Sequence, residues 1–293
     1  MRKIIPFLAA TFVAFATSAA ISAPVLYGLG DTTLDNARFH SNLYTIDTTT
    51  GAATLVGDTG FNLRGLAIDP VTGKAYASLA EQNSGGTAGG LYKINLATGA
   101  ASLIGGTQNF SEMTFDGAGN LFGYGTRVGA ADGYDYLSID VNTGVGTLLS
   151  STALNTANYA IFGIAYSSAD DETYLYQQWF SGSGGEGLWT IDLTDGTPTL
   201  VVSSTGQFYR PDLAADDSGN LYTIDRQFGA TGTSLYSLDK TTGLTTSIGL
   251  NGAGLNSITF ANSATATVPE PGTLAIIGLG LAGLGYARRK RAA

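Results

Sequence analysis

The sequence has no cysteine and only one histidine, His40, in 293 residues. Without cysteine the chain cannot form disulfide bonds, bind a metal through thiolates or carry a lipid on a thiol. One histidine cannot supply the several imidazole ligands that most zinc and copper sites use. A Ser-His-Asp arrangement would have to use His40, and no Gly-x-Ser-x-Gly segment accompanies it. The composition therefore argues against thiol-, histidine- and serine-based catalysis.

Charge is also scarce, and it is unevenly placed. Charged residues make up 13% of the chain, and 6 of the 14 basic ones lie at the two ends. The stretch from Pro24 to Thr267 keeps 8 basic and 22 acidic side chains, a net charge of −14. Such an acidic body repels nucleic acid and anionic membrane surfaces, so no nucleic-acid partner is expected. The glycines lie between short strands rather than before helices, which argues against a phosphate-cradling loop and a nucleotide cofactor.

The C-terminus has three parts in a fixed order. Val268-Pro-Glu-Pro is followed by an uncharged run from Gly272 to Ala287 and then by a basic cluster, Arg288, Arg289, Lys290 and Arg291. The run of 16 residues would span about 24 Å as a helix, slightly short of the ~20 residues that usually cross a bilayer. The basic cluster should stay on the cytoplasmic side as a membrane stop, which leaves the preceding chain outside.

This tail resembles the PEP-CTERM sorting signal of Gram-negative bacteria, with Pro269, Glu270 and Pro271 as the sorting motif. The resemblance implies an exported protein that is anchored in the inner membrane facing the periplasm. It also implies an exosortase-type processing enzyme as partner, and a final location at the cell surface or in the extracellular matrix of a biofilm. The tail indicates a destination and leaves the biochemical activity open.

The N-terminus independently indicates export. Arg2 and Lys3 precede an apolar stretch, Ile4–Ala16, and then the small-residue segment TSAAISA. This layout is typical of a secretory signal peptide, which we place at residues 1–22. An uncleaved anchor is the alternative, but the apolar run is short and the small residues suit cleavage.

A strand–turn–strand phrase recurs five times along the body. The copies start at Leu43, Leu91, Tyr136, Leu188 and Leu235, separated by 48, 45, 52 and 47 residues, a period typical of propeller blades. Each copy has Asp or Asn at the end of its first strand and Gly about four residues later. These residue types supply side-chain-to-backbone bonds and positive φ, so each copy predicts a β-hairpin.

A second hairpin phrase fills the gaps between the copies, at residues 63–78, 110–124, 161–177 and 209–225. A fifth version starts at Leu255 but supplies only one strand, and the missing partner strand lies at the other end, Val25–Asp31. Pairing these two strands completes a fifth blade of four strands. It also provides hydrogen-bond partners for the strand edges that an open array would leave exposed. The sequence therefore predicts an all-β, five-bladed propeller over residues 24–261, closed by its N- and C-terminal strands. A polar linker at 262–268 would join it to the tail at 269–293. The phrases also resemble glycine- and aspartate-rich propeller repeats of secreted bacterial proteins. A β-solenoid or an open array is the alternative fold.

Carboxylates are the first candidates for chemistry. Equivalent turns carry Asp69, Asp116, Asp216 and Asp217, and the fourth such turn has a cluster of Asp170, Asp171 and Glu172. Otherwise neutral loops are interrupted by Glu81, Glu112 and Glu186. They could bind Ca²⁺ or act as an acid–base pair flanking a sugar bond. The other interpretation is that Asp is the residue that these turns require. No catalytic or metal-binding residue is assigned.

Aromatic residues concentrate in the fourth repeat, between Tyr159 and Trp189, where most of them would pack between blades. Trp179, Phe180 and Gln177 adjoin a glycine-rich insertion and are the candidate ligand-binding residues, because aromatic faces with amide neighbours suit sugars. The sequence thus favours a non-enzymatic surface or matrix protein that binds glycans or proteins. The alternative is an extracellular hydrolase or lyase, dependent on carboxylates or Ca²⁺, that acts on polysaccharide or a small ester.

Overall fold

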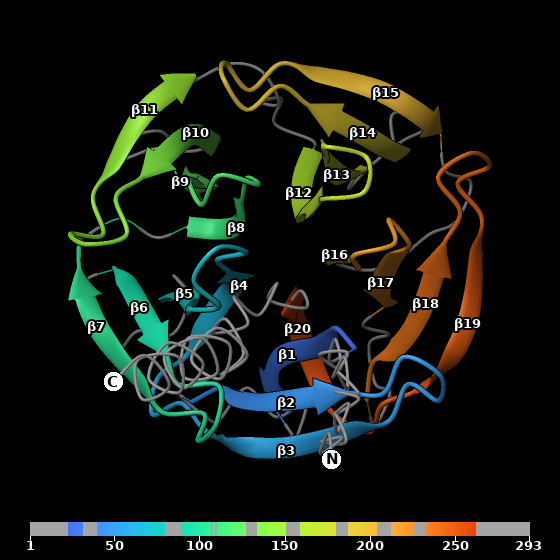
Figure 1. The fold of residues 1–293 in the computed structure, drawn as a ribbon, viewed down its shortest axis with the longest axis horizontal. Coiled ribbons are helices and arrows are strands. Elements are labelled where there is room, and N and C mark those ends of the chain that lie inside the picture. The colour runs from blue at the N-terminus through green and yellow to red at the C-terminus, as the bar shows by residue number, and fades with distance from the viewer. Residues whose placement is uncertain are drawn as a thin grey trace, which may run out of the picture. The chain divides into compact units, whose positions relative to one another are not determined.

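The computed structural model describes residues 23–31, 40–79, 89–106, 108, 110–126, 134–150, 159–179, 187–203, 212–225 and 232–261. These residues form twenty strands in five four-stranded antiparallel sheets, which surround a common centre in Figure 1. The predicted all-β, five-bladed propeller is confirmed.

Each sheet is one blade, named here in chain order. Blade I consists of β20 (Gly254–Ala261), β1 (Val25–Asp31), β2 (Asn42–Ile46) and β3 (Ala53–Asp58). Blade II consists of β4 (Leu63–Ile68), β5 (Ala75–Leu79), β6 (Leu91–Ile94) and β7 (Ala101–Gly105). Blade III consists of β8 (Phe110–Phe115), β9 (Leu121–Thr126), β10 (Tyr134–Ile139) and β11 (Gly146–Ser150). Blade IV consists of β12 (Tyr159–Ser167), β13 (Glu172–Trp179), β14 (Gly187–Ile191) and β15 (Pro198–Ser203). Blade V consists of β16 (Leu213–Ala215), β17 (Leu221–Asp225), β18 (Ser234–Leu238) and β19 (Thr245–Leu250).

The first strand of each blade lies innermost. β20, β4, β8, β12 and β16 each contact the innermost strands of both neighbouring blades, so they form a closed ring around the centre (Figure 1). Blade I closes this ring from both ends of the described chain, because β20 pairs with β1 from Val25↔Ala261 to Asp31↔Gly254. This pairing is the closure predicted from the incomplete fifth repeat.

The hairpin turns follow from the residues at their ends. In the β2–β3 turn, Asp47 Oδ1 accepts hydrogen bonds from the backbone N–H groups of Thr49 (2.8 Å) and Thr50 (3.0 Å), and Gly51 has φ +76°. A hydrogen bond from the Thr49 hydroxyl, followed by these two backbone bonds, lowers the pKa of Asp47. Asn95, Asp140, Asp192 and Asp239 hold the four equivalent turns in the same way.

Glycine also allows the outer strands of one blade to pack closely against the hairpin turn of the next blade. A Cβ atom on Gly57 at the end of β3 would lie 2.1 Å from the carbonyl oxygen of Thr98 in the next blade. Gly105 and Gly249 meet the turns of their own neighbours equally closely. A side chain at these positions would push adjacent blades apart, which gives part of the high glycine content a structural role.

The core is divided among the five interfaces between blades. One cluster, for example, joins Leu26, Tyr44 and Ile46 of blade I to Ile224 and Leu235 of blade V. Tyrosines supply much of the remaining volume, and four are almost completely buried: Tyr92, Tyr124, Tyr136 and Tyr176. Aromatic packing between blades is therefore confirmed for Tyr174 and Tyr176 of the fourth repeat.

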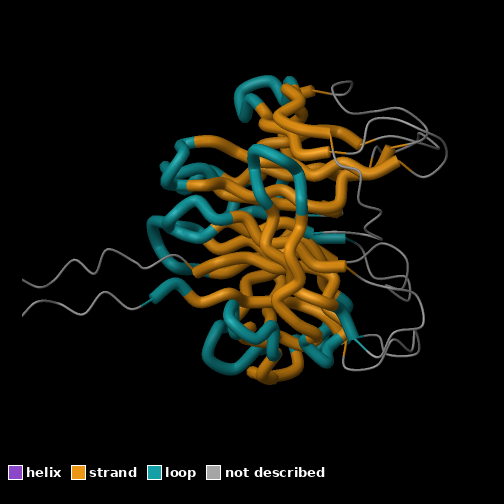
Figure 2. The backbone as a smooth tube through the Cα atoms, turned by 90° about the vertical axis from the view of Figure 1, so that its right-hand side faces the viewer, coloured by secondary structure: helices purple, strands orange, loops and turns teal. Residues whose placement is uncertain are grey.

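The tight turns lie at one end of the strands, because the strands alternate in direction and each turn joins a first to a second or a third to a fourth strand of a blade (Figure 2). We call this end the turn face. The predicted signal peptide, the linker, the sorting tail and its helix lie outside the described residues. Among the residues that are described, none belongs to a helix long and apolar enough to cross a membrane.

Candidate functional site

Two arrangements of polar groups stand out in the described part of the propeller. The first lies at the ring of innermost strands. One equivalent position of the repeat, in or directly before each of these strands, is occupied in chain order by Gly65, Glu112, Gly163, Asp212 and Ser257. Pairing registers shift at this level in β4, β8, β12 and β20, so four of the five strands have an irregularity there. Bulges of this kind redirect side chains and are frequent beside functional sites.

Glu112 and Asp212 are brought together although their strands belong to blades that are not neighbours. Strand β12 lies between them and has Gly163 at the equivalent position, where a Cβ atom would stand 2.4 Å from the backbone nitrogen of Leu213. The absence of a side chain leaves the two carboxyl groups free to form a hydrogen bond with each other. Asp212 is only 3% exposed.

Asp212 is held by backbone donors as well. Its Oδ1 accepts from Leu213 N at 2.8 Å, its Oδ2 accepts from Ile258 N at 2.5 Å, and the Ser257 side chain adds a further hydrogen bond. Burial nevertheless raises the pKa of Asp212 to about 7. These bonds tie the start of β16 to β20 and so support the ring.

Glu112 is the protonated member of the pair. Burial raises its pKa well above the usual value, the charge of Asp212 raises it further, and the Arg64 guanidinium opposes both effects. Glu112 therefore donates its proton to Asp212, as expected for two carboxyl groups in contact that cannot both ionise. Above the pKa of Asp212 the pair offers one acid and one carboxylate.

The pair is not placed like the carboxylates of a glycosidase. Those enzymes separate their two carboxyl groups by about 5 Å or more, with the sugar bond between them. Glu112 and Asp212 are joined by a direct hydrogen bond instead. The other glutamates considered as partners of Glu112, Glu81 and Glu186, lie outside the described residues.

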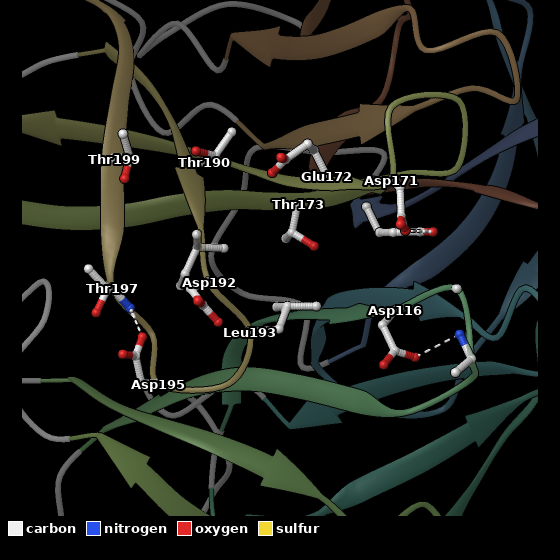
Figure 3. Close-up of a pocket in the computed structure, with 14 residues that line it drawn as sticks. Asp116, Asp171, Glu172, Thr173, Thr190, Asp192, Leu193, Asp195, Thr197 and Thr199 are labelled. Atoms are coloured by element: carbon white, nitrogen blue, oxygen red, sulfur yellow. Dashed lines mark hydrogen bonds between the residues drawn. The ribbon is translucent and has the colours of Figure 1, made fainter.

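The second arrangement is a cavity of about 900 Å³ at the turn face, between blades III and IV (Figure 3). Five carboxylates line it: Asp116, Asp171, Glu172, Asp192 and Asp195. Hydroxyl groups complete the polar lining: Tyr166, Thr173, Thr190, Thr197 and Thr199. The cavity therefore combines negative charge with hydrogen-bonding side chains.

Several of these acids also hold turns. Asp116 Oδ1 accepts from Ala118 N at 3.0 Å, and Asp195 Oδ1 accepts from Thr197 N at 2.8 Å (Figure 3). Hydrogen bonds from Thr194 lower the pKa of Asp192. Asp69, Asp116 and Asp216 likewise accept backbone hydrogen bonds in their own turns, which supports the interpretation that these turns require Asp.

Thr173 and Tyr166 give the cavity one buried and one half-buried hydroxyl group. Thr173 is 3% exposed, and its hydroxyl has no hydrogen-bond partner among the described residues. The Tyr166 hydroxyl donates to Asp171 Oδ1 at 2.9 Å. Burial, followed by this hydrogen bond, raises the pKa of Tyr166 to about 12. Buried hydroxyl groups normally find partners, so the Thr173 hydroxyl is available to a bound molecule.

The candidate ligand-binding residues from the sequence occupy another place. Gln177 and Trp179 lie near the C-terminal end of β13, away from the turn face. The first residues of the same strand, at its other end, line the cavity. The side chains of Gln177 and Trp179, and the whole of Phe180, lie outside the described part of the chain, as do the sorting motif and the basic cluster. Sequence reasoning missed the cavity. The cavity could have been predicted from residues 173, 195 and 197, which differ in type from the residues at the equivalent positions of the other four repeats.

In the part of the chain that the structure describes, no group of three or more His, Asp or Glu side chains is arranged to hold a metal ion. The Ca²⁺ considered from the sequence therefore has no assigned ligands.

Comparison with known proteins identifies the tail. The PEP-CTERM protein-sorting motif matches residues 267–291, which include Pro269–Pro271 and the basic cluster. This match confirms the predicted sorting signal, and the motif implies an exported, membrane-anchored protein that an exosortase processes. None of the curated proteins matches the sequence.

Solved structures resemble the body at low sequence identity. TolB from Acinetobacter baumannii is 12% identical, with 83% of this chain and 68% of that chain covered and a TM-score of 0.45. The PQQ-bound aldose sugar dehydrogenase of Streptomyces coelicolor is 12% identical over 76% and 85% of the two chains, with a TM-score of 0.42. The gluconolactonase XC5397 of Xanthomonas campestris is 12% identical over 81% and 80%, with a TM-score of 0.46. Because the identity is 12% and each TM-score is below 0.5, these similarities support no statement about the activity of this chain.

Proposed function

We propose that this exosortase-sorted protein is a non-enzymatic component of the cell surface or extracellular matrix whose propeller binds an extracellular glycan. The observation that carries the proposal is the cavity of about 900 Å³ at the turn face, with its hydroxyl and carboxylate lining. Its size is typical of a ligand site. Threonine hydroxyls and carboxylates form hydrogen bonds with the hydroxyl groups of sugars.

We expect the full chain, purified in detergent, to be retarded in native gels that contain a polysaccharide ligand. A panel of neutral, acidic and amine-bearing polysaccharides supplies the probes, and a gel without polysaccharide supplies the reference mobility. Retardation by none of them would contradict glycan binding.

The variant Trp179→Ala then tests which end of β13 binds the glycan. Binding at the turn face predicts that this variant is retarded like the parent chain. Loss of retardation would instead assign the glycan to Trp179, Phe180 and Gln177, the residues that the sequence favours.

A second candidate function is hydrolysis of a small ester, which the Glu112–Asp212 pair favours. Hydrolysis of a polysaccharide has no such support, because the two carboxyl groups are joined by a hydrogen bond and do not flank a sugar bond. The Asp212 carboxylate would take a proton from an attacking water, and the Glu112 carboxyl would donate one to the leaving oxygen. This second candidate predicts that the full chain hydrolyses p-nitrophenyl acetate and that Asp212→Asn loses about 100-fold or more of that rate. A Ca²⁺-dependent form of this proposal also requires added Ca²⁺ to raise the rate and EDTA to abolish it. Equal rates for the parent chain, Asp212→Asn and buffer would contradict this candidate.

A further inference from the structure

The five repeats provide an internal reference for the cavity, because equivalent positions can be compared within one chain. The position of Thr173 in β13 is apolar in the other four blades, where it is Leu26, Ala75, Leu121 and Leu221. All four of those side chains are buried and belong to the core. Blade IV has replaced a core side chain by one with a buried hydroxyl that lacks a partner among the described residues. Such a replacement costs stability unless something binds the hydroxyl.

The β14–β15 turn departs from the repeat at two further positions. Asp195 stands where the equivalent turns have a threonine: Thr50, Thr98, Thr143 and Thr242. Thr197 stands where they have an apolar residue: Ala52, Ala100, Val145 and Leu244. Both replacements line the cavity (Figure 3). The turn itself does not require them, since the other four turns form without them.

The β12–β13 hairpin also differs from its equivalents in the other blades by added polar groups. Asp171 is the one residue other than glycine with positive φ (+54°) among those that the structure describes. Tyr166, whose hydroxyl donates to Asp171, stands where other inner strands have Ile68, Phe115, Ala215 and Phe260. The departures from the repeat at Tyr166, Thr173, Asp195 and Thr197 therefore converge on one cavity and add polar groups there.

The charge of the cavity restricts its ligand. Five carboxylates line it, and none of its described lining residues is basic. An acidic sugar would be repelled, and a neutral one would form hydrogen bonds with the carboxylates without gaining from their charge. A single metal ion does not fit either, because no three of the described acids are arranged around one point. Charges spread over a cavity of this size suit a ligand that carries several separate cationic groups as well as hydroxyls.

We propose that the turn-face cavity binds a polymer of amino sugars through its protonated amino groups, with Thr173 and Thr197 binding the sugar hydroxyls. This assignment rests on the proposed glycan-binding function and names its ligand class. Carboxylate–ammonium contacts are charge-assisted hydrogen bonds and weaken as salt screens them. The N-acetylated polymer keeps the shape and hydroxyls of the ligand but lacks its charge, so it provides the matched comparison.

Titration calorimetry of the full chain in detergent tests this assignment with hexamers of glucosamine and of N-acetylglucosamine as probes. We expect the glucosamine hexamer to bind at least about tenfold more tightly, and its affinity to fall as NaCl is raised. Asp195→Thr should weaken it about tenfold, because it removes one charged contact, and Thr173→Val should weaken it with little change in side-chain volume.

The controls come from the repeat itself. Asp195→Thr installs the residue of the other four turns, so it is compatible with the fold, and an unchanged melting temperature verifies this. Asp58→Asn in blade I removes the same amount of charge at an exposed position, and we expect it to leave the affinity unchanged.

Three results would overturn the assignment in distinguishable ways. Equal affinity for the two hexamers would keep glycan binding and reject the cationic ligand. Binding of polylysine, but of neither hexamer, that Asp195→Thr weakens would make the partner a basic protein. Binding of no hexamer, together with no retardation by any polysaccharide in gels, would reject the proposed function as well.

Discussion

A chain that ends at Gly254 should fail to fold into the propeller, whereas one that ends at Val268 should melt at the temperature of the full chain. The shorter product lacks β20, which supplies the innermost strand of blade I and pairs with β1 along its whole length. It also loses Leu255, Ile258 and Phe260, which are at most 6% exposed. Burying such side chains contributes about 1.5–3 kcal/mol each, so their joint loss approaches the ~5–15 kcal/mol of a typical domain.

Circular dichroism melts of the two products, both without residues 1–22, check this expectation. Deletion of Val25–Asp31 is the matched control, because it removes the other member of the β1–β20 pair and should be equally damaging. The longer product loses only residues beyond the last strand, so processing near the sorting motif would leave the propeller closed. A cooperative melt of the shorter product at the unchanged temperature would contradict closure by the terminal strands.

The fold could be predicted because its signals are local. Each hairpin needs Asp or Asn at the end of one strand and Gly a few residues later, and these residues are visible in every repeat. The closure followed because a strand without a partner at Leu255 matched one at Val25. The strand bounds in the structure differ from the expected ones by a residue or two, as for β20, which begins at Gly254 rather than Leu255.

The candidate sites could not be predicted in the same way. Glu112 and Asp212 are 100 positions apart, in blades that are not neighbours, and they meet only because Gly163 of the intervening strand lacks a side chain. Nothing in the local sequence of either residue reports that contact. The cavity was overlooked for a different reason. Its residues Thr173 and Asp195 are noticeable only as differences between repeats, whereas propeller repeats are recognised by their similarities.

The Glu112–Asp212 pair should make the propeller less stable as the pH rises from 5 to 8. The unfolded chain has ordinary carboxyl pKa values, about 3.9 for Asp and 4.3 for Glu. In the folded chain burial raises the pKa of Asp212 to about 7 and that of Glu112 well above its usual value. Between these limits the folded state binds more protons than the unfolded state, so the free energy of unfolding falls as the pH rises. The contribution is complete below about pH 4 and is lost progressively through pH 7, on the order of a few kcal/mol.

The exposed turn carboxylates act in the opposite direction and in another pH range. Hydrogen bonds lower the pKa values of Asp47, Asp140, Asp192 and Asp239, so their contribution is lost only when the pH falls below the ordinary carboxyl range. Melting temperatures measured between pH 5 and 8 therefore exclude the contribution of these turn carboxylates.

Glu112→Gln/Asp212→Asn should remove most of the slope in melting temperature against pH, because neither amide ionises and the Gln side chain can still donate across the ring. Asp140→Asn, at an exposed turn carboxyl of blade III whose equivalent in blade II is Asn95, should keep the slope of the parent chain. A parent chain whose melting temperature is constant or rises between pH 5 and 8 would show that the pair does not hold its proton. A double variant that keeps the slope would assign it to other groups. If the parent chain shows the slope and the double variant loses it, we conclude that a proton shared by Glu112 and Asp212 allows β8 and β16 to lie close together on either side of Gly163. Its removal would leave two negative charges in contact at the centre of the ring, with the nearby Arg64 guanidinium as partial compensation.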